Sequence, residues 1–334
     1  MADSFARTRD EAWISTGRLP TEEVVRELVT EAHRRFAPVA EGTVARYIPA
    51  LAEANPNHFG LCVATPNGLI IEAGEARQAF TIQSLSKPFL FALIGAAIGE
   101  DVAREKLGVN STGLPFNSVL AVERTEEGLS NPMVNAGAIA ATSLAPGDTA
   151  AEKWAFILEG FSRFAGRPLA IDPVVFASEL ETNKRNLGIA TLLEEQERIW
   201  FPPEATTELY TRQCALSVTT RDLALMATTL ANGGRQPLTG EQVIAPRVCQ
   251  HVLAVMVTAG LYETSGDWLY DIGLPGKSGV AGGMITVAPG KGGLATFSPP
   301  LDETGNSVRG QLTAAFLSER LGLNLFASRP AAVG

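Results

Sequence analysis

A serine and a lysine three residues apart form the first pattern that could carry chemistry. Ser84-Leu85-Ser86-Lys87 follows an alternating run that ends at Ile82 and precedes an apolar stretch from Phe89 to Ala97. Alternation indicates a strand and a continuous apolar stretch of this length a buried helix, so Ser84 is expected where a strand passes into a helix. Residues three apart on a helix share a face, which lets the Lys87 amine reach the Ser84 hydroxyl. This S-x-x-K spacing is typical of a serine nucleophile activated by a lysine base.

Activation of the serine requires Lys87 to be uncharged near neutral pH. Lowering a lysine pKa from ~10.4 to ~7 costs about 4–5 kcal/mol, which burial among apolar groups can supply. Leu85 and the run Pro88-Phe89-Leu90-Phe91 flank the lysine, so we expect it to be buried. The plainer alternative is a serine that only caps the helix and a lysine that is solvated on the first turn. S-x-x-K occurs often by chance, and other segments must decide between the two interpretations.

A second conspicuous segment is Gly276-Lys277-Ser278-Gly279-Val280-Ala281-Gly282-Gly283. A phosphate-binding loop of the G-x-x-x-x-G-K-S type would need glycine at position 271, where Asp271 stands. The segment fits better as the K-T-G-like element that enters a strand beside the nucleophile in S-x-x-K enzymes. The N–H groups of Val280 and Ser84 could then form an oxyanion hole, each contributing on the order of 3 kcal/mol. Without the Ser84–Lys87 pair, a simple glycine-rich turn would be the favoured interpretation.

Several polar groups outside these segments are ordinary when each is taken by itself. Asn135 stands among small residues between Asn131 and Ala138, which is typical of a turn followed by a packed helix. Glu179 and Asn186 belong to a polar run that fits a solvated helix face. The remaining candidates are aromatic residues with no local signal of function, namely Tyr47, Tyr210 and Tyr262.

Composition excludes several classes of function. The net charge of −9 and the absence of a basic run argue against nucleic acid and anionic membranes as partners. The longest apolar run spans about ten residues, too few to cross a bilayer, and the first residues lack an apolar signal-peptide core, so a cytoplasmic protein is expected. Three cysteines and three histidines are scattered along the chain, so we expect reduced thiols, no metal site and no cofactor.

The order of the predicted elements indicates an α+β fold. A hairpin over residues 58–73 and a strand near Phe80 come early, strands near 279–287 and 293–297 come late, and helical patterns fill the middle. We therefore expect an antiparallel sheet formed from the N- and C-terminal segments plus an inserted helical lobe. The predicted organisation is an irregular segment over 1–20, a single domain over 21–327 and a frayed tail over 328–334. Within the domain, the sheet lobe takes about 21–83 and 262–327, and the helical lobe about 84–261.

Taken in order, these segments resemble the serine-dependent glutaminase family, whose fold is that of β-lactamases and penicillin-binding proteins. The resemblance covers about residues 22–326 and rests on a series of short blocks in sequence order, which are Tyr47-Ile48-Pro49, Gln83 to Pro88, Asn131 to Ile139, Ser178-Glu179, Arg185-Asn186, Leu230 to Gly234, Lys277 to Gly283 and Ser298 to Asp302. A series of blocks is far more specific than any single motif.

The resemblance implies a mechanism for hydrolysing the side-chain amide of L-glutamine to L-glutamate and ammonia. Ser84 would attack the amide and form a glutamyl ester, with Lys87 taking the serine proton. The N–H groups of Ser84 and Val280 would hold the oxyanion, and Tyr262 would pass a proton to the departing ammonia. No cofactor would take part.

The resemblance also implies how the substrate is held. Glu179 would pair with the α-ammonium group, and Gln83 would line the site. The carboxylate and backbone anchors would be Tyr47, Asn135, Asn186 and Tyr210. A free amino acid needs such polar partners, because both of its charged ends must be paired when buried.

Two features of the sequence bear on how far the resemblance extends. The stretch from Leu180 to Lys184 departs from the acidic, glycine-containing pattern common in the family. The chain also lacks long flanking regions and ankyrin-type repeats, which indicates a compact bacterial-type enzyme and leaves phosphate activation and filament assembly open. The family implies a homodimer or homotetramer.

Two other functions stay open at this point. A β-lactamase or esterase could use the same scaffold, although the missing export signal argues against the first. A glutamine-binding sensor that lost turnover is the third hypothesis, and the intact Ser84 and Lys87 argue against it.

Overall fold

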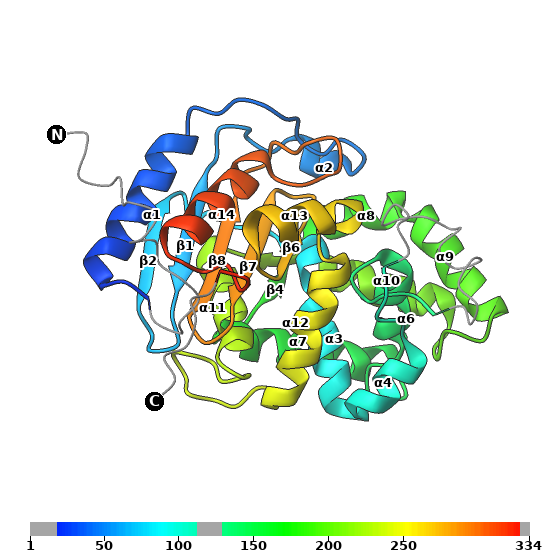
Figure 1. Ribbon diagram of the computed structural model, residues 1–334. Coiled ribbons are helices and arrows are strands. Elements are labelled where there is room, and N and C mark those ends of the chain that lie inside the picture. The colour runs from blue at the N-terminus through cyan, green and yellow to red at the C-terminus, as the bar shows by residue number, and fades with distance from the viewer. Residues whose placement is uncertain (1–18, 112–128, 328–334) are drawn as a thin grey trace, which may run out of the picture.

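The fold is built on one antiparallel sheet that joins the two ends of the chain (Figure 1). The computed structural model describes residues 19–111 and 129–327, so the predicted tail and nearly all of the predicted N-terminal segment lie outside the described residues. The strand order is β2-β1-β8-β7-β6, with β1 at Gly60–Ala64, β2 at Ile70–Gly74, β6 at Gly276–Ser278, β7 at Gly283–Ala288 and β8 at Gly292–Phe297. This arrangement confirms the expected sheet.

The central pairing of the sheet is between strands more than 200 positions apart in the sequence. β1 runs antiparallel to β2 on one side, with Ala64 opposite Ile70 beside the predicted Asn-Gly turn, and antiparallel to β8 on the other. Gly68 in that turn has φ +84°, a conformation that glycine adopts without penalty. Because β8 also pairs with β7, the early hairpin and the late strands form a single continuous layer.

Helices cover both faces of the sheet, as the alternation of its side chains requires. Leu61 and Val63 lie in a core with helices α1 and α14, whereas Cys62 and Ala64 belong to the larger core that contains α11. The covering helices are α1 (Glu22–Phe36), α14 (Val308–Arg320), α13 (Ser265–Ile272) and, on the other face, α11 (Thr220–Ala231).

The helical lobe surrounds one buried helix, α3 (Ser86–Ile98). Its residues from Ser86 to Gly95 are all buried, and it packs against α4, α6, α7 and α12. The other helices of the lobe are α4 (Glu100–Lys106), α6 (Asn135–Ser143), α7 (Ala150–Ala165), α8 (Pro173–Thr182), α9 (Lys184–Glu195), α10 (Pro203–Cys214) and α12 (Pro246–Ala259). A short helix, α2 (Pro49–Ala52), lies between α1 and β1 in the chain.

The structure differs from the sequence-based expectation at both candidate catalytic segments. Ser84 lies in a 3₁₀ turn, η2 (Gln83–Leu85), and the α-helix begins only at Ser86. The late strand begins at Gly283 instead of 279, because Gly279–Gly282 form a tight turn in which the Gly282 N–H bonds the Gly279 carbonyl at 2.9 Å. A small second sheet, β3-β5-β4, was not predicted; it comprises Phe80–Thr81, Leu216–Val218 and Ala170–Ile171.

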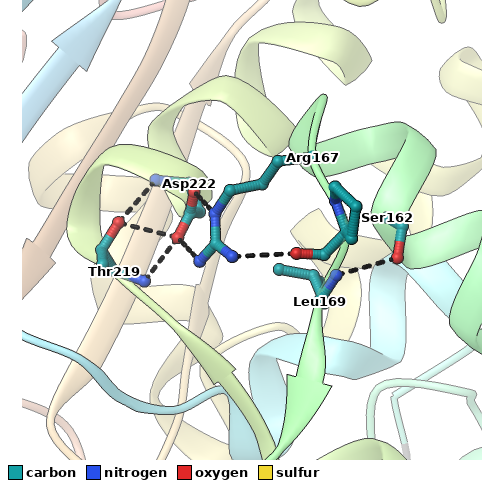
Figure 2. Close-up of polar contacts among 6 residues, drawn as sticks. Ser162, Arg167, Leu169, Thr219 and Asp222 are labelled. Carbon is teal, nitrogen blue, oxygen red and sulfur yellow. Dashed lines mark hydrogen bonds and ion pairs between the residues drawn. The ribbon is translucent and has the colours of Figure 1, made fainter.

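One buried carboxylate fixes the start of α11, the helix that covers the sheet (Figure 2). Asp222 Oδ2 accepts the N–H and hydroxyl of Thr219, and Thr219 Oγ1 accepts the Asp222 N–H, which forms a reciprocal cap. Arg167 donates to both oxygens of Asp222, at 2.7 and 2.6 Å. The carboxylate therefore ties the segment after α7 to the first turn of α11.

Asp222→Ala is expected to lower the free energy of unfolding by about 2–4 kcal/mol, because it removes a helix cap and leaves buried donors without an acceptor. The paired guanidinium contributes the smaller part, since the Arg167 side chain is 46% exposed. Urea unfolding followed by circular dichroism measures the loss. Glu152→Ala in the exposed capping box of α7 is the matched control, and an equal or larger loss there would contradict the assignment.

Candidate active site

A cavity of about 460 Å³ gathers most of the predicted site residues. Eight of the ten predicted positions line it, and they are Tyr47, Gln83, Ser84, Asn135, Glu179, Asn186, Tyr210 and Val280. The two others, Lys87 and Tyr262, are buried and contact lining residues, as described below. Segments far apart in the sequence thus meet at the place where η2, α6, α8, α9 and α10 come together.

Ser84 is placed by a strained turn. It is 8% exposed, and the preceding Gln83 has φ +52°, a conformation that non-glycine residues seldom adopt. Such backbone strain persists only where the surroundings hold it, and it is concentrated at functional sites. The Gln83 amide is held by Thr81 Oγ1 at 3.2 Å and Glu179 Oε2 at 3.1 Å. The turn therefore presents the Ser84 hydroxyl to the cavity from a fixed position.

Lys87 is buried as predicted, with 1% of its surface exposed. Burial lowers the pKa of its amine to about 7, and the nearby Glu179 carboxylate opposes part of this shift. Lys87 Nζ donates to Asn135 Oδ1 at 2.6 Å. A hydrogen bond from this amine to Ser84 is not among the contacts of the described residues. The Ser84–Lys87 pairing therefore stays a prediction, and the hydrogen bond that the structure gives this amine is with Asn135.

The Ser84 side chain lies close to the phenol of Tyr262. Burial raises the pKa of Tyr262 to about 12, and the neighbouring Ser84 and Ser278 side chains lower it in part, so the phenol is neutral at physiological pH. Tyr262 has φ +59° at the start of η3 (Tyr262–Thr264). Lys87 Nζ lies 5.8 Å from the centroid of its ring. The tyrosine is therefore close to both members of the predicted Ser84–Lys87 pair.

Lys277 is a second buried amine to which the sequence assigned no role of its own. It lies in β6, its Nζ donates to the Ser278 carbonyl at 2.9 Å, and it sits 4.0 Å from the Tyr262 ring centroid. Burial holds its pKa well below the usual range, and the charge of Lys87 lowers it further. The available signal was a lysine among small residues at the entry to a strand, which the structure shows to be the edge strand β6. Two amines thus flank one phenol in a water-poor interior.

Glu179 is the buried acid of the cavity, with 7% of its surface exposed. Burial raises the pKa of its carboxyl to about 7, whereas the Gln83 amide and the Lys87 amine lower it in part. It lies in α8, whose start is fixed by Asp172 Oδ1 accepting the N–H groups of Val174 and Val175. The acid is thus held in place while only part of its charge is compensated within the protein.

Asn135, the first residue of α6, connects three of the predicted groups. Its Oδ1 accepts from Lys87 and, at 3.3 Å, from the Tyr210 hydroxyl, and its Nδ2 donates to Asn186 Oδ1 at 3.0 Å. Tyr210 is buried, whereas Tyr47 is 59% exposed and lies at the outer part of the wall. Lys87, Asn135, Asn186 and Tyr210 are therefore joined in one hydrogen-bond network.

The sequence reasoning missed five further lining residues. Cys214 is a buried thiol whose pKa is raised by burial, and the side chains of Tyr210 and Ser86 interact with it. The others are Ile48, Thr182, Asn183 and Arg185. Arg185 belongs to one of the blocks that carry the family resemblance, but no role was assigned to it. The other lining residues were missed because no short sequence pattern marks them.

No metal site or membrane span is found in the described part of the chain. Residues 19–111 and 129–327 contain no group of three or more histidine, cysteine or acidic side chains suited to a metal ion. The same residues include no helix that is long and apolar enough to cross a membrane.

Comparison with known proteins agrees with this geometry. The sequence model of the glutaminase family matches residues 42–326. Glutaminase 2 of Yersinia pestis is 57% identical over 318 residues, covering 95% of this chain and 94% of that protein. The solved structure of a probable glutaminase has a TM-score of 0.90 and 40% identity, covering 92% of this chain and 99% of that one.

A further solved structure, a probable glutaminase from Bacillus subtilis complexed with 6-diazo-5-oxo-L-norleucine, has a TM-score of 0.82 and 33% identity. It covers 90% of this chain and 96% of that one. These relatives define an amidohydrolase with the β-lactamase-like fold. The chain belongs to the glutaminase family.

The raised pKa of Glu179 predicts a pH-dependent penalty on stability. The folded protein keeps this proton up to about pH 7 and the unfolded chain only to about pH 4.5, so unfolding releases a proton in that window. Stability therefore falls as the pH rises through it, by roughly 3 kcal/mol in all. Glu179→Gln removes the penalty, so the variant should gain roughly this much relative to the parent between pH 4.5 and pH 8.

Urea unfolding of parent and variant at pH 4.5 and pH 8 measures this difference. Glu181→Gln, an exposed position in the same helix, is the matched control. A difference between parent and Glu179→Gln that stays constant across the two pH values would show that the carboxyl titrates alike in both states.

Proposed function

We propose that this glutaminase hydrolyses the side-chain amide of L-glutamine through a glutamyl ester on Ser84. The observation that carries the proposal is a serine hydroxyl at a cavity wall, close to a neutral phenol and to a buried amine with a pKa of about 7. Such an amine can accept a proton at neutral pH, and a serine needs such a base to act as a nucleophile.

In the first step the Ser84 oxygen bonds to the amide carbon of glutamine while its proton passes to Lys87 Nζ. The carbonyl becomes a tetrahedral oxyanion, which the N–H groups of Ser84 and Val280 would bind. Ser84 and Val280 both line the cavity, which supports this assignment.

In the second step the carbon–nitrogen bond breaks and ammonia leaves. The neutral Tyr262 phenol donates a proton to the departing nitrogen and regains one from the Lys87 ammonium. Water then adds to the glutamyl ester, its proton goes to the same base, and glutamate leaves as the Ser84 hydroxyl is restored. The sequence returns every group to its starting state without a cofactor.

The cavity wall supplies partners for a free amino acid. Glu179 pairs with the α-ammonium group, which compensates a carboxylate that the protein itself leaves partly unpaired. Gln83 lines the site, and the carboxylate and backbone are held by Tyr47, Asn135, Asn186 and Tyr210. The Bacillus relative solved with 6-diazo-5-oxo-L-norleucine supports a pocket of this size and chemistry.

The division into a single domain over 21–327 with two lobes stays part of the proposal, as do the cytoplasmic location and the homodimeric or homotetrameric state.

Ser84→Ala should reduce ammonia release from L-glutamine by at least about 10³-fold, because it removes the oxygen that attacks the amide. A coupled glutamate dehydrogenase assay measures the rate. Calorimetric binding of L-glutamate, expected within a few-fold of the parent value, verifies that the variant is folded. Turnover above a tenth of the parent rate would show that another group is the nucleophile.

The activity should rise with pH through about 7. Catalysis needs Lys87 uncharged and Glu179 charged, and both pKa values are about 7, so each group must lose a proton in the same range. Because the two groups interact, the protons leave in two steps that belong to the pair. The plot of log kcat/KM against pH from 5 to 8.5 should approach a slope of two at low pH and then level off.

Glu179→Gln should reduce the limiting slope of that plot to one while weakening substrate binding. Asn57→Asp, which adds a carboxyl on the exposed loop before β1, is a control that should leave the profile unchanged. A parent rate that fell as the pH rose through 7 would contradict the assigned protonation states.

A further inference from the structure

The cavity wall carries one guanidinium to which neither the family resemblance nor the proposed mechanism gives a role. Among the side chains that line the cavity, Glu179 and Arg185 are the two that carry charge. The phenol of Tyr210 and the thiol of Cys214 stay neutral because burial raises the pKa of both. The wall therefore holds one negative and one positive group, which matches the charges of a zwitterionic amino acid.

Glu179 and Arg185 come from one short segment but lie at different depths. Glu179 is buried near the end of α8, whereas Arg185 is exposed in the first turn of α9. Asn183 separates the two helices, and its Nδ2 donates to Thr211 Oγ1 of α10 at 2.8 Å. This bond anchors the break between the helices. Arg185 is exposed and lines the same cavity as the buried Glu179, which places it at the rim.

The proposed carboxylate anchors leave a charge uncompensated. Tyr47, Asn135, Asn186 and Tyr210 offer hydrogen bonds but no positive charge, and Lys87 must be neutral for catalysis. A carboxylate that leaves water is stabilised best by a charge-assisted bond, and a guanidinium can bind both of its oxygens. Arg185 lies two residues after Asn183, where the helices break, and directly before Asn186. Both Arg185 and Asn186 line the cavity, so a guanidinium and an amide are available on this part of the wall.

We propose that Arg185 determines the specificity of the cavity for an α-carboxylate by binding that group of L-glutamine at the rim. This assignment rests on the proposed function of the site and adds a residue to it. The chemistry occurs at Ser84, on a different part of the wall, so Arg185 contributes to capture and not to the reaction step. Loss of its charge should raise KM and leave kcat nearly unchanged.

The expected effect is moderate because the side chain is exposed to solvent. Arg185→Gln should raise KM for L-glutamine roughly 5- to 10-fold, with kcat within about twofold of the parent. Arg185→Lys should fall between parent and Arg185→Gln, because it keeps the charge and loses the paired donors. Arg185→Glu should raise KM furthest, since it sets like charges against each other.

The experiment measures KM and kcat for this series together with the calorimetric Kd of L-glutamate, which carries the same α-carboxylate. Arg104→Gln is the matched control, since it removes the same charge from an exposed arginine in α4 that lines a separate groove. The proposal is supported if KM and Kd rise from Arg185→Lys through Arg185→Gln to Arg185→Glu. Arg104→Gln should keep the parent values.

Two results would overturn the assignment. One is an Arg185→Gln variant whose KM and Kd stay within twofold of those of Arg104→Gln. The other is a loss in kcat as large as the loss in kcat/KM, which would indicate a disturbed reaction step instead of a lost contact. A parent protein that releases no ammonia from L-glutamine refutes the proposed function alone, because the Kd series for L-glutamate still decides whether Arg185 binds the carboxylate.

Discussion

The burial of one amine is the constraint on which the rest of this structure depends. Bringing the Lys87 pKa from 10.5 to about 7 corresponds to about 5 kcal/mol of destabilisation of the charged form. Only the centre of a large core can impose this, and α3 occupies that centre, enclosed by α6, α7 and α12. The size of the helical lobe is therefore connected to the chemistry, because a thinner shell would leave the amine hydrated and charged.

Buried polar groups at the site are connected but not fully satisfied. Asn135 joins Lys87, Tyr210 and Asn186, and Gln83 holds Glu179. Two non-glycine residues with positive φ, Gln83 and Tyr262, stand beside this network. Strain and partial desolvation are concentrated here, while capped helices such as α11 stabilise the fold elsewhere. The features that lower stability are therefore concentrated at the functional site, and the features that raise it lie elsewhere in the fold.

The sequence predicted those parts of the structure that local patterns determine. The hairpin and the burial of Lys87 follow from alternation and apolar flanks, and both are confirmed. The 3₁₀ turn at Ser84 and the β3-β5-β4 sheet were missed because they depend on contacts between distant segments. The contact of Lys87 with Asn135 was missed for the same reason, since it depends on packing between α3 and α6. Family resemblance supplied the residues that no local signal marks, such as Tyr47 and Tyr210.

Because Glu179 and Lys87 interact electrostatically, the pKa values of both groups should depend on whether a substrate occupies the cavity. A charged Glu179 raises the pKa of Lys87 and so works against the neutral amine that catalysis needs. A substrate ammonium group beside Glu179 would compensate that carboxylate, and the opposing influence on Lys87 would weaken. The same ammonium would favour the ionised form of Glu179 itself. Binding an amino acid would therefore favour both required protonation states at once, whereas a ligand without an ammonium group would leave the base partly protonated.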